Sequence, residues 1–115
     1  MAYIKRYCGP IVYEINNGIF RRYCGSYEYE IYQNKLKKYC GQFLFEFDGN
    51  KIRYYCGQYI LEFDGHYVRR YCGPIIAEVM DNKIRDYCGQ FRYEVSGSLT
   101  QYEWMGLITL LYGGL

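Results

Sequence analysis

Apolar and charged residues alternate along the chain and recur every 16 residues, at positions that the cysteines mark. An apolar residue stands four positions before each cysteine, and another stands seven positions after it. A base stands three positions before each cysteine, and a glutamate stands six positions after it. Around Cys56 these residues are Ile52, Arg53, Glu62 and Phe63. Neighbouring positions of opposite polarity are typical of β-strands, and the fixed period predicts six tandem repeats over residues 1–98.

Residues that favour turns fall at two places in each repeat. One place is the Gly-x pair after the cysteine, such as Gly57-Gln58, which fits a two-residue hairpin turn with glycine first. The other is a polar pair such as Gly65-His66, which follows Asp64. The segments between these turns are about six residues long, a common strand length. Each repeat is therefore expected to be one β-hairpin.

The two turns together predict a strand register. Closing the first turn on Gly57-Gln58 places Arg53 opposite Glu62, and Ile52 opposite Phe63. Closing the second turn on Gly65-His66 places Arg69 opposite Glu62, and Val68 opposite Phe63. One face of the sheet would then carry a structural charge ladder of alternating sign, represented by Arg53, Glu62 and Arg69, and the other face would carry an apolar row.

This alternation favours an antiparallel meander of hairpins over a β-solenoid. A solenoid would stack equivalent positions about 4.8 Å apart, so that glutamates would lie beside glutamates and bases beside bases. Like charges directly across strands cost about 0.2–1 kcal/mol each. The fold class is therefore predicted to be mainly β, with the meander curled or self-associating. The solenoid is the alternative, because 16 residues also suits one solenoid turn.

The segment 99–115 departs from the repeat and predicts an amphipathic helix over about 101–112. Thr100 and Glu103 form a capping box at its start, and Trp104 begins an apolar stripe at helical spacing. We expect the helix to pack on the apolar sheet face within a single domain, with Trp104 buried. An open sheet of twelve strands would be about 58 Å wide, so either it curls around the helix or the chain self-associates.

The predicted apolar face contains charged residues close to the cysteines. These residues share the parity of the apolar row, so a bulge, a corner or snorkelling is needed to accommodate them. They are Arg6, Arg22, Lys38, Arg70 and Asp86.

Composition narrows the functional classes. Half of the residues are apolar, so disorder is not expected, and the net charge of +2 does not by itself indicate nucleic acid. The N-terminus lacks the apolar stretch of a signal peptide, and the longest apolar run is too short to span a bilayer. We therefore expect a soluble, cytoplasmic protein that does not associate with membranes.

Catalytic and metal-binding chemistry finds little support in the sequence. Equivalent cysteines of a meander would lie about 9.6 Å apart, beyond disulfide reach, so six free thiols buried beside turns are predicted. No Cys-x-x-Cys pair occurs, and His66 is the only histidine, so a zinc site lacks local support. Each glutamate is expected between two bases, which lowers its pKa and makes it a poor general acid. We predict no enzyme activity, no metal and no cofactor.

One candidate binding face remains, formed by the tyrosine that precedes each cysteine. These residues are Tyr7, Tyr23, Tyr39, Tyr55, Tyr71 and Tyr87. The leading hypothesis is a non-enzymatic repeat scaffold that acts by self-association or protein binding, with a homo-oligomer or a protein partner. The alternative is a nucleic-acid-binding face of these tyrosines and the adjacent bases, which the interleaved glutamates disfavour. A third hypothesis is an enzyme with a pocket where the sheet curls.

The unit Tyr55-Cys56-Gly57 and its equivalents resemble MORN repeats and other short bacterial β-hairpin repeats over about residues 1–98. MORN units are longer and richer in glycine, and their second glycine pair is missing here. The resemblance implies a scaffold or a binding module, and no functional residue can be carried over.

Overall fold

The computed structural model describes residues 1–114, which form twelve β-strands followed by one α-helix. Residue 115, the end of the predicted helical segment, lies outside this range. The strands are β1 (Ala2–Arg6), β2 (Ile11–Asn16), β3 (Ile19–Arg22), β4 (Tyr27–Tyr32), β5 (Lys35–Lys38), β6 (Phe43–Asp48), β7 (Lys51–Tyr54), β8 (Tyr59–Phe63), β9 (Tyr67–Arg70), β10 (Ile75–Met80), β11 (Lys83–Asp86) and β12 (Phe91–Gly97). The helix is α1 (Gln101–Tyr112).

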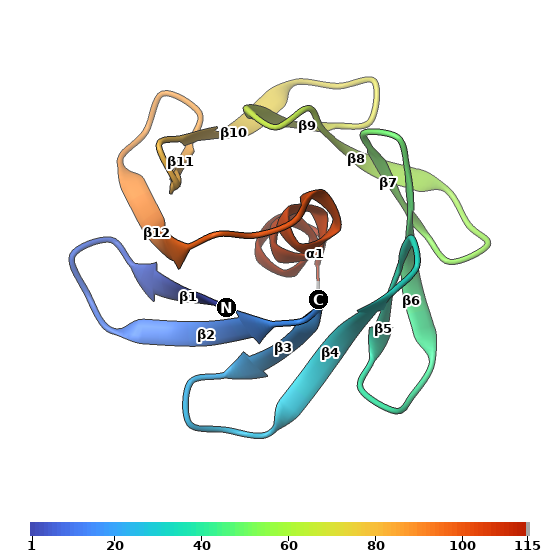
Figure 1. The fold of residues 1–115 in the computed structure, drawn as a ribbon. Coiled ribbons are helices and arrows are strands. Elements are labelled where there is room, and N and C mark those ends of the chain that lie inside the picture. The colour runs from blue at the N-terminus through green and yellow to red at the C-terminus, as the bar shows by residue number, and fades with distance from the viewer. Residues whose placement is uncertain (115) are drawn as a thin grey trace.

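The strands form a closed antiparallel barrel in which each strand pairs with its sequence neighbours and β1 pairs with β12. Figure 1 shows this ring of strands around α1. The antiparallel meander is thus confirmed, in its curled form, and the solenoid is wrong. The turns alternate between two rims. The cysteine rim carries residues 7–10, 23–26, 39–42, 55–58, 71–74 and 87–90, and the opposite rim carries the remaining turns together with the start of α1.

The strand register agrees with the prediction on one side of each strand and differs on the other. Between β8 and β9, Glu62 pairs with Arg69 and Phe63 pairs with Val68, as predicted. Between β7 and β8, Glu62 pairs with Lys51 instead of Arg53, and Ile52 pairs with Leu61 instead of Phe63. The pairing of Arg53 with Glu62 is therefore wrong, although a different base occupies that place.

The difference arises in the turn that contains the cysteine. Gly57 N–H donates to the carbonyl of Tyr54 over 2.8 Å, so the turn is centred on Tyr55-Cys56 and not on Gly57-Gln58. Cys56 has the positive φ, at 55°. Glycine is required next to it for space, because a Cβ at Gly57 would lie 2.9 Å from the Cβ of Tyr54. The strand register moves by two residues, with a bulge before Arg53, and a shift of two leaves each side chain on its predicted face.

The inward faces of the strands form one apolar core. Every member of the predicted apolar row is buried except Ile31, which is half-buried. A second inward ring nearer the cysteine rim includes Phe45 and Leu61, both buried, and the half-buried Tyr13 and Tyr93. The alternation of apolar and charged positions thus separates the inside of the barrel from the outside.

Helix α1 begins and ends as the sequence predicts. The Thr100 side chain accepts from Glu103 N–H, and Glu103 accepts from Thr100 N–H in return. The second carboxylate oxygen of Glu103 accepts from Gly18 N–H over 2.8 Å, which ties the helix to the turn between β2 and β3. The central residues Met105–Thr109 are all buried, because the barrel surrounds the helix instead of covering one stripe.

The size of the ring explains how the helix fits. Twelve strands about 4.8 Å apart, tilted by about 40°, make a barrel about 24 Å across. A helix with its side chains is about 10–12 Å wide, which leaves about one layer of inward side chains on each side. The helix lies close to the wall at Gly106, where a Cβ would lie 2.8 Å from Phe20 Cζ. Trp104, predicted to be buried, is only half-buried.

No helix within residues 1–114 is long and apolar enough to cross a membrane.

Candidate functional site

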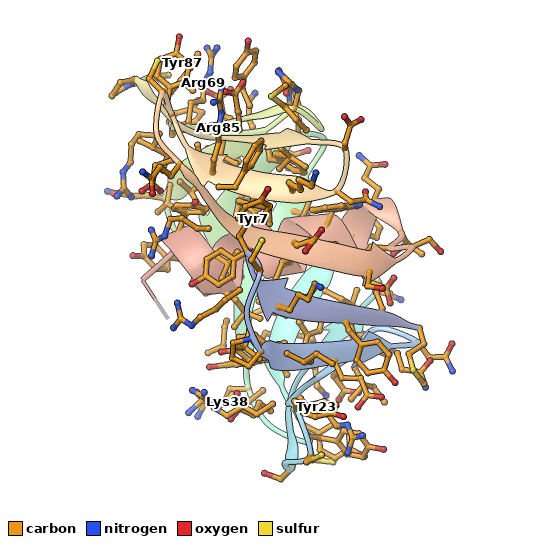
Figure 2. The ribbon with its side chains drawn as sticks, turned by 90° about the vertical axis from the view of Figure 1, so that its left-hand side faces the viewer. Tyr7, Tyr23, Lys38, Arg69, Arg85 and Tyr87 are labelled. Carbon is orange, nitrogen blue, oxygen red and sulfur yellow. The ribbon has the colours of Figure 1, made fainter. Side chains whose placement is uncertain are left out.

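The six turn tyrosines lie together on the cysteine rim, and all are exposed, between 39% and 49%. Figure 2 labels three of them, Tyr7, Tyr23 and Tyr87. Each ring is partly covered by a neighbour. Tyr55 packs on Phe43, with ring centroids 5.1 Å apart, and Tyr7 makes the equivalent contact with Phe91 across the closure of the barrel, at 5.4 Å. These tyrosines therefore belong to an aromatic belt around the outside of the barrel.

Bases cover the same belt. Lys51 Nζ and Arg53 Cζ each lie 5.8 Å from the centroid of Tyr59, within the range of cation–π attraction. Lys37 Nζ and Lys35 Nζ lie over Phe43 at 5.7 Å and 5.8 Å. These four outer bases are thus already held against aromatic rings of the protein.

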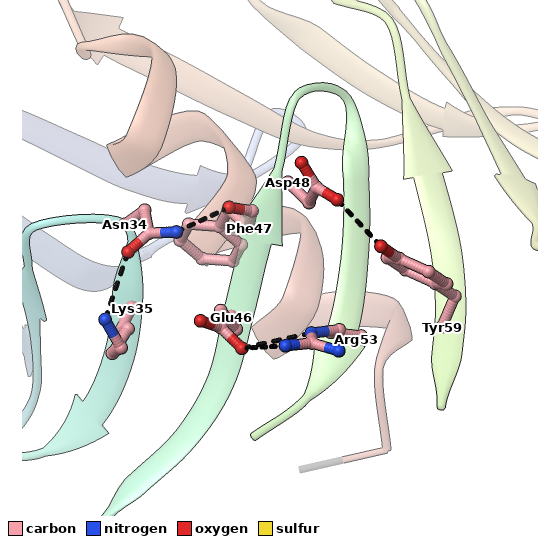
Figure 3. A network of polar contacts seen from close by, with 7 residues as sticks. All are labelled: Asn34, Lys35, Glu46, Phe47, Asp48, Arg53 and Tyr59. Carbon is pink, nitrogen blue, oxygen red and sulfur yellow. Dashed lines mark hydrogen bonds and ion pairs between the residues drawn. The ribbon is translucent and has the colours of Figure 1, made fainter. Parts of the chain in front are cut away.

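The outer bases are also paired with the glutamates of the charge ladder. Arg53 donates to Glu46 from Nε over 3.0 Å and from Nη2 over 2.6 Å, as Figure 3 shows. In the same figure, Tyr59 Oη donates to Asp48 over 2.7 Å. Further ladder pairs are Lys5–Glu94, Arg21–Glu14, Lys37–Glu30 and Arg85–Glu78. Five of the six ladder glutamates are therefore paired with a base on the outer wall.

Glu62 and Arg69, the remaining pair of the predicted ladder, stand opposite each other without an ion pair among residues 1–114. Glu62 Oε1 instead accepts from Cys72 N–H over 3.4 Å. This contact joins the ladder to the cysteine turn.

A second set of bases faces the inside of the barrel at the cysteine rim. Arg6 pairs in register with Tyr93, Lys38 with Tyr29, and Arg70 with the fully buried Leu61. Directly paired residues share a face, so these bases lie on the inward face of the strands, at its open end, where their side chains are exposed. We call Arg6, Arg22, Lys38, Arg70 and Arg92 the mouth bases. Four of them, with Asp86, are the residues that the sequence marked only as exceptions to the apolar face. The structure adds Arg92 and places them all where the lumen opens to solvent.

The acids at this mouth are fewer than the bases. Glu28 Oε2 lies 3.1 Å from Arg22 Nε, and Asp86 Oδ1 lies 3.3 Å from Arg92 Nη1. Arg6, Lys38 and Arg70 have no ion pair among the described residues. Because the outer ladder neutralises itself, the excess positive charge of the chain is concentrated at this mouth.

A cavity of about 350 Å³ lies beside the end of the helix at this mouth. Arg22, Glu28, Lys38 and Leu110 line it with Tyr13 and Tyr29. The Arg22 guanidinium lies 5.6 Å from the Tyr13 centroid. Burial raises the pKa of Tyr13 above its ordinary value, while Arg22 acts in the opposite direction. The cavity thus combines aromatic walls with a free lysine.

The last turn of α1 closes another part of the mouth. Tyr112 Oη donates to Asp86 Oδ1 over 3.3 Å. Burial, followed by the charge of Asp86, raises the pKa of Tyr112 to about 12. The phenol is therefore a neutral donor at physiological pH.

The cysteines of this rim are free and exposed. The prediction that they are buried beside the turns is wrong, because the turn is centred on the cysteine and directs its side chain outward. In the part of the chain that the structure describes, no three His, Cys, Asp or Glu side chains are grouped as a metal site would require.

The geometry therefore brings the six predicted tyrosines to one rim, pairs five outer bases with ladder glutamates, and adds the unpaired mouth bases. No family model, no curated protein and no solved structure matches this chain.

Proposed function

We propose that the protein is a non-enzymatic binding module, and that its cysteine rim holds an acidic segment of a partner protein. The observation that carries this proposal is the set of unpaired mouth bases, Arg6, Lys38 and Arg70, within a ring of exposed tyrosines.

The charges support an anionic partner. A concentration of one sign of charge at a concave opening attracts ligands of the other sign. The outer ladder contributes no such field, because its glutamates and bases are equal in number and most are paired. A carboxylate-rich segment entering the mouth would form ion pairs with Arg6, Lys38 and Arg70 and neutralise their charge.

The tyrosines support a protein surface as the partner. Tyrosine and arginine are enriched at the centres of protein interfaces, where they supply large contact areas at low entropic cost. The turn tyrosines already pack on aromatic neighbours, as Tyr55 does on Phe43. Side chains that are packed before binding lose less conformational freedom when a partner binds.

The same features favour a peptide over the two other candidates. A single-stranded nucleic acid needs a continuous basic groove with ring faces free for stacking, whereas the unpaired mouth bases come from separate strand ends and the ring faces are partly covered. Self-association through sheet edges was expected for an open sheet. The closed ring leaves residues 1–98 without a free edge, so the proposal rests on a separate partner.

The test compares a labelled oligoglutamate peptide with a labelled single-stranded oligonucleotide of equal charge, by fluorescence anisotropy. The test variant replaces Arg6, Lys38 and Arg70 with Gln. The matched control replaces Lys35, Lys51 and Lys83 with Gln, which removes the same charge from the outer wall near the opposite rim. We expect the peptide to bind the parent and the control, and to bind the test variant at least about tenfold more weakly.

Two outcomes would contradict the proposal. Equal loss in both variants would mean that net charge alone holds the peptide. Tighter binding of the oligonucleotide than of the peptide, lost on replacing Tyr23 and Tyr87 with Ser, would support the nucleic-acid-binding face instead.

A further inference from the structure

A second cavity, of about 560 Å³, lies at the opposite rim between the first turns of α1 and the barrel wall. Its floor contains Phe63, Val79 and Met105, which are buried, and Trp104, which is half-buried. The indole of Trp104 lies 6.3 Å from the Phe63 ring, between centroids. The only tryptophan of the chain therefore presents part of its surface to a cavity with an apolar floor.

The mouth of this cavity is acidic. Asp64 and Asp81 line it, and none of its lining residues is Lys or Arg. Asp64 Oδ1 accepts from His66 N–H over 2.9 Å and from Tyr67 N–H over 2.8 Å. These bonds, chiefly that from Tyr67, lower the pKa of Asp64, so its carboxylate stays charged. Asp81 has no hydrogen bond or ion pair among residues 1–114.

The nearby bases are directed elsewhere. Lys51 Nζ lies over Tyr59, and Lys83 Nζ lies over Phe91, each at 5.8 Å on the outer wall. His66 Nε2 lies 3.3 Å from Glu78 Oε2. Arg69 borders a smaller hollow on the other side of Asp64, and the two make no ion pair in the described part of the chain. The positive end of the helix is occupied by its own capping box.

We infer that this cavity binds a small organic cation, an ammonium group carried on an apolar body. The ammonium would lie over the Trp104 indole, the aromatic ring that attracts cations most strongly, between the carboxylates of Asp64 and Asp81. The apolar body would cover Phe63 and Met105. This site is separate from the cysteine rim, and the inference does not depend on the function proposed for that rim.

Because Trp104 is the only tryptophan, its fluorescence reports directly on the cavity. The probes are choline, its uncharged isostere 3,3-dimethyl-1-butanol, and methyl glucoside, which tests a sugar as the ligand. We expect choline to change Trp104 emission saturably, with a Kd of about 1 mM or below. The neutral alcohol is expected to need a concentration at least about tenfold higher.

The variants test the carboxylates. Asp64→Asn with Asp81→Asn should weaken choline binding at least about tenfold, and Asn at 64 can still accept the turn hydrogen bonds. Asp48→Asn, at the same rim but outside the cavity, is the matched control and should bind choline like the parent. Circular dichroism of each variant verifies folding.

Three results would overturn the inference. They are the absence of a saturable change with choline, equal binding of choline and the neutral alcohol, and binding of methyl glucoside in preference to choline.

Discussion

Lys5 on β1 and Glu94 on β12 stand opposite each other and join the two ends of the barrel, with Nζ 3.4 Å from Oε1. The same pairing joins Glu30 and Lys37 within one hairpin. The last strand therefore pairs with the first through the same base–glutamate pairing that joins neighbouring strands within the chain.

This relationship predicts the effect of reversing charges at the closure. Lys5→Glu should lower the free energy of unfolding by about 0.2–1 kcal/mol, because two carboxylates would face each other. Adding Glu94→Gln should restore part of the loss, as measured by urea unfolding, because it removes the facing carboxylate without placing a second base opposite Lys83, the partner of residue 94 on β11. A double variant no more stable than the single variant would contradict the closure.

Gly106→Ala should destabilise the protein. Alanine improves helix propensity by about 1 kcal/mol, but its Cβ would lie 2.8 Å from Phe20 Cζ and 3.1 Å from Ile31 Cδ1. Overpacking of this kind costs about 1–3 kcal/mol, so we expect a net loss. Phe20→Leu in the same chain should reduce the cost of Gly106→Ala. A stabilising Gly106→Ala would mean that the helix does not approach the wall there.

Cys56→Val should destabilise, and Cys56→Gly should be neutral or stabilising. Cys56 has a φ of 55°, a conformation that costs residues with a Cβ about 1–2 kcal/mol and costs β-branched residues most. Urea unfolding of both variants measures the difference, with Cys56→Ser as the control for loss of the thiol. Equal stability of the Val and Gly variants would show that the turn has another geometry.

All six thiols should react with a thiol reagent in the native protein, without denaturant. This expectation follows from their exposure on the cysteine rim. The count is compared with that of the unfolded, unreduced chain. Reaction of the six thiols only after unfolding would place the cysteines inside, and a stoichiometric loss in both samples would indicate disulfides.

Tyr112→Phe should remove part of the loss of stability at high pH. Below about pH 10 the phenol is protonated in both states. Between this value and the pKa of about 12 that Tyr112 has in the folded protein, only the unfolded chain loses the proton, so the free energy of unfolding falls as the pH rises. We expect the variant to lose about 1 kcal/mol less across this window, a figure reduced for partial exposure.

The control for this experiment is Tyr102→Phe, at an exposed tyrosine on the same helix. If the two variants have the same pH dependence of stability as the parent, Tyr112 is not the group that titrates.

The sequence predicted those elements whose signals come from residues close together along the chain or on directly paired strands. Thr100 and Glu103 define the start of α1 with their own side chains. The alternation of charge along the predicted ladder favoured a meander over a solenoid, because Coulomb repulsion acts between direct neighbours. The turn at Cys56 escaped prediction because positive φ is ordinarily assigned to glycine. Here Cys56 has the positive φ, and Gly57 is needed because a Cβ at that position would collide with Tyr54.

The candidate sites depended on closure, which no local pattern specifies. Arg70 and Lys38 contradict an apolar face when the sheet is taken as flat. They become a binding feature only when the face curls into a lumen with an open end. The helical spacing of Trp104 likewise predicts burial in the core. Its exposure to a cavity depends on the position of the barrel wall relative to the helix.

The helix inside the ring has a consequence for how such a chain can change its length. Duplication of one 16-residue unit would add two strands and widen the ring by about 4 Å, which would leave the helix loose. Loss of one unit would narrow the ring by the same amount, and inward side chains such as Phe20 would then overlap with the helix. Strand pairing alone would allow any number of units. The diameter of the helix therefore determines how many units the ring contains. A longer or shorter relative is therefore expected to carry a correspondingly bulkier or slimmer helix, the two parts changing in step.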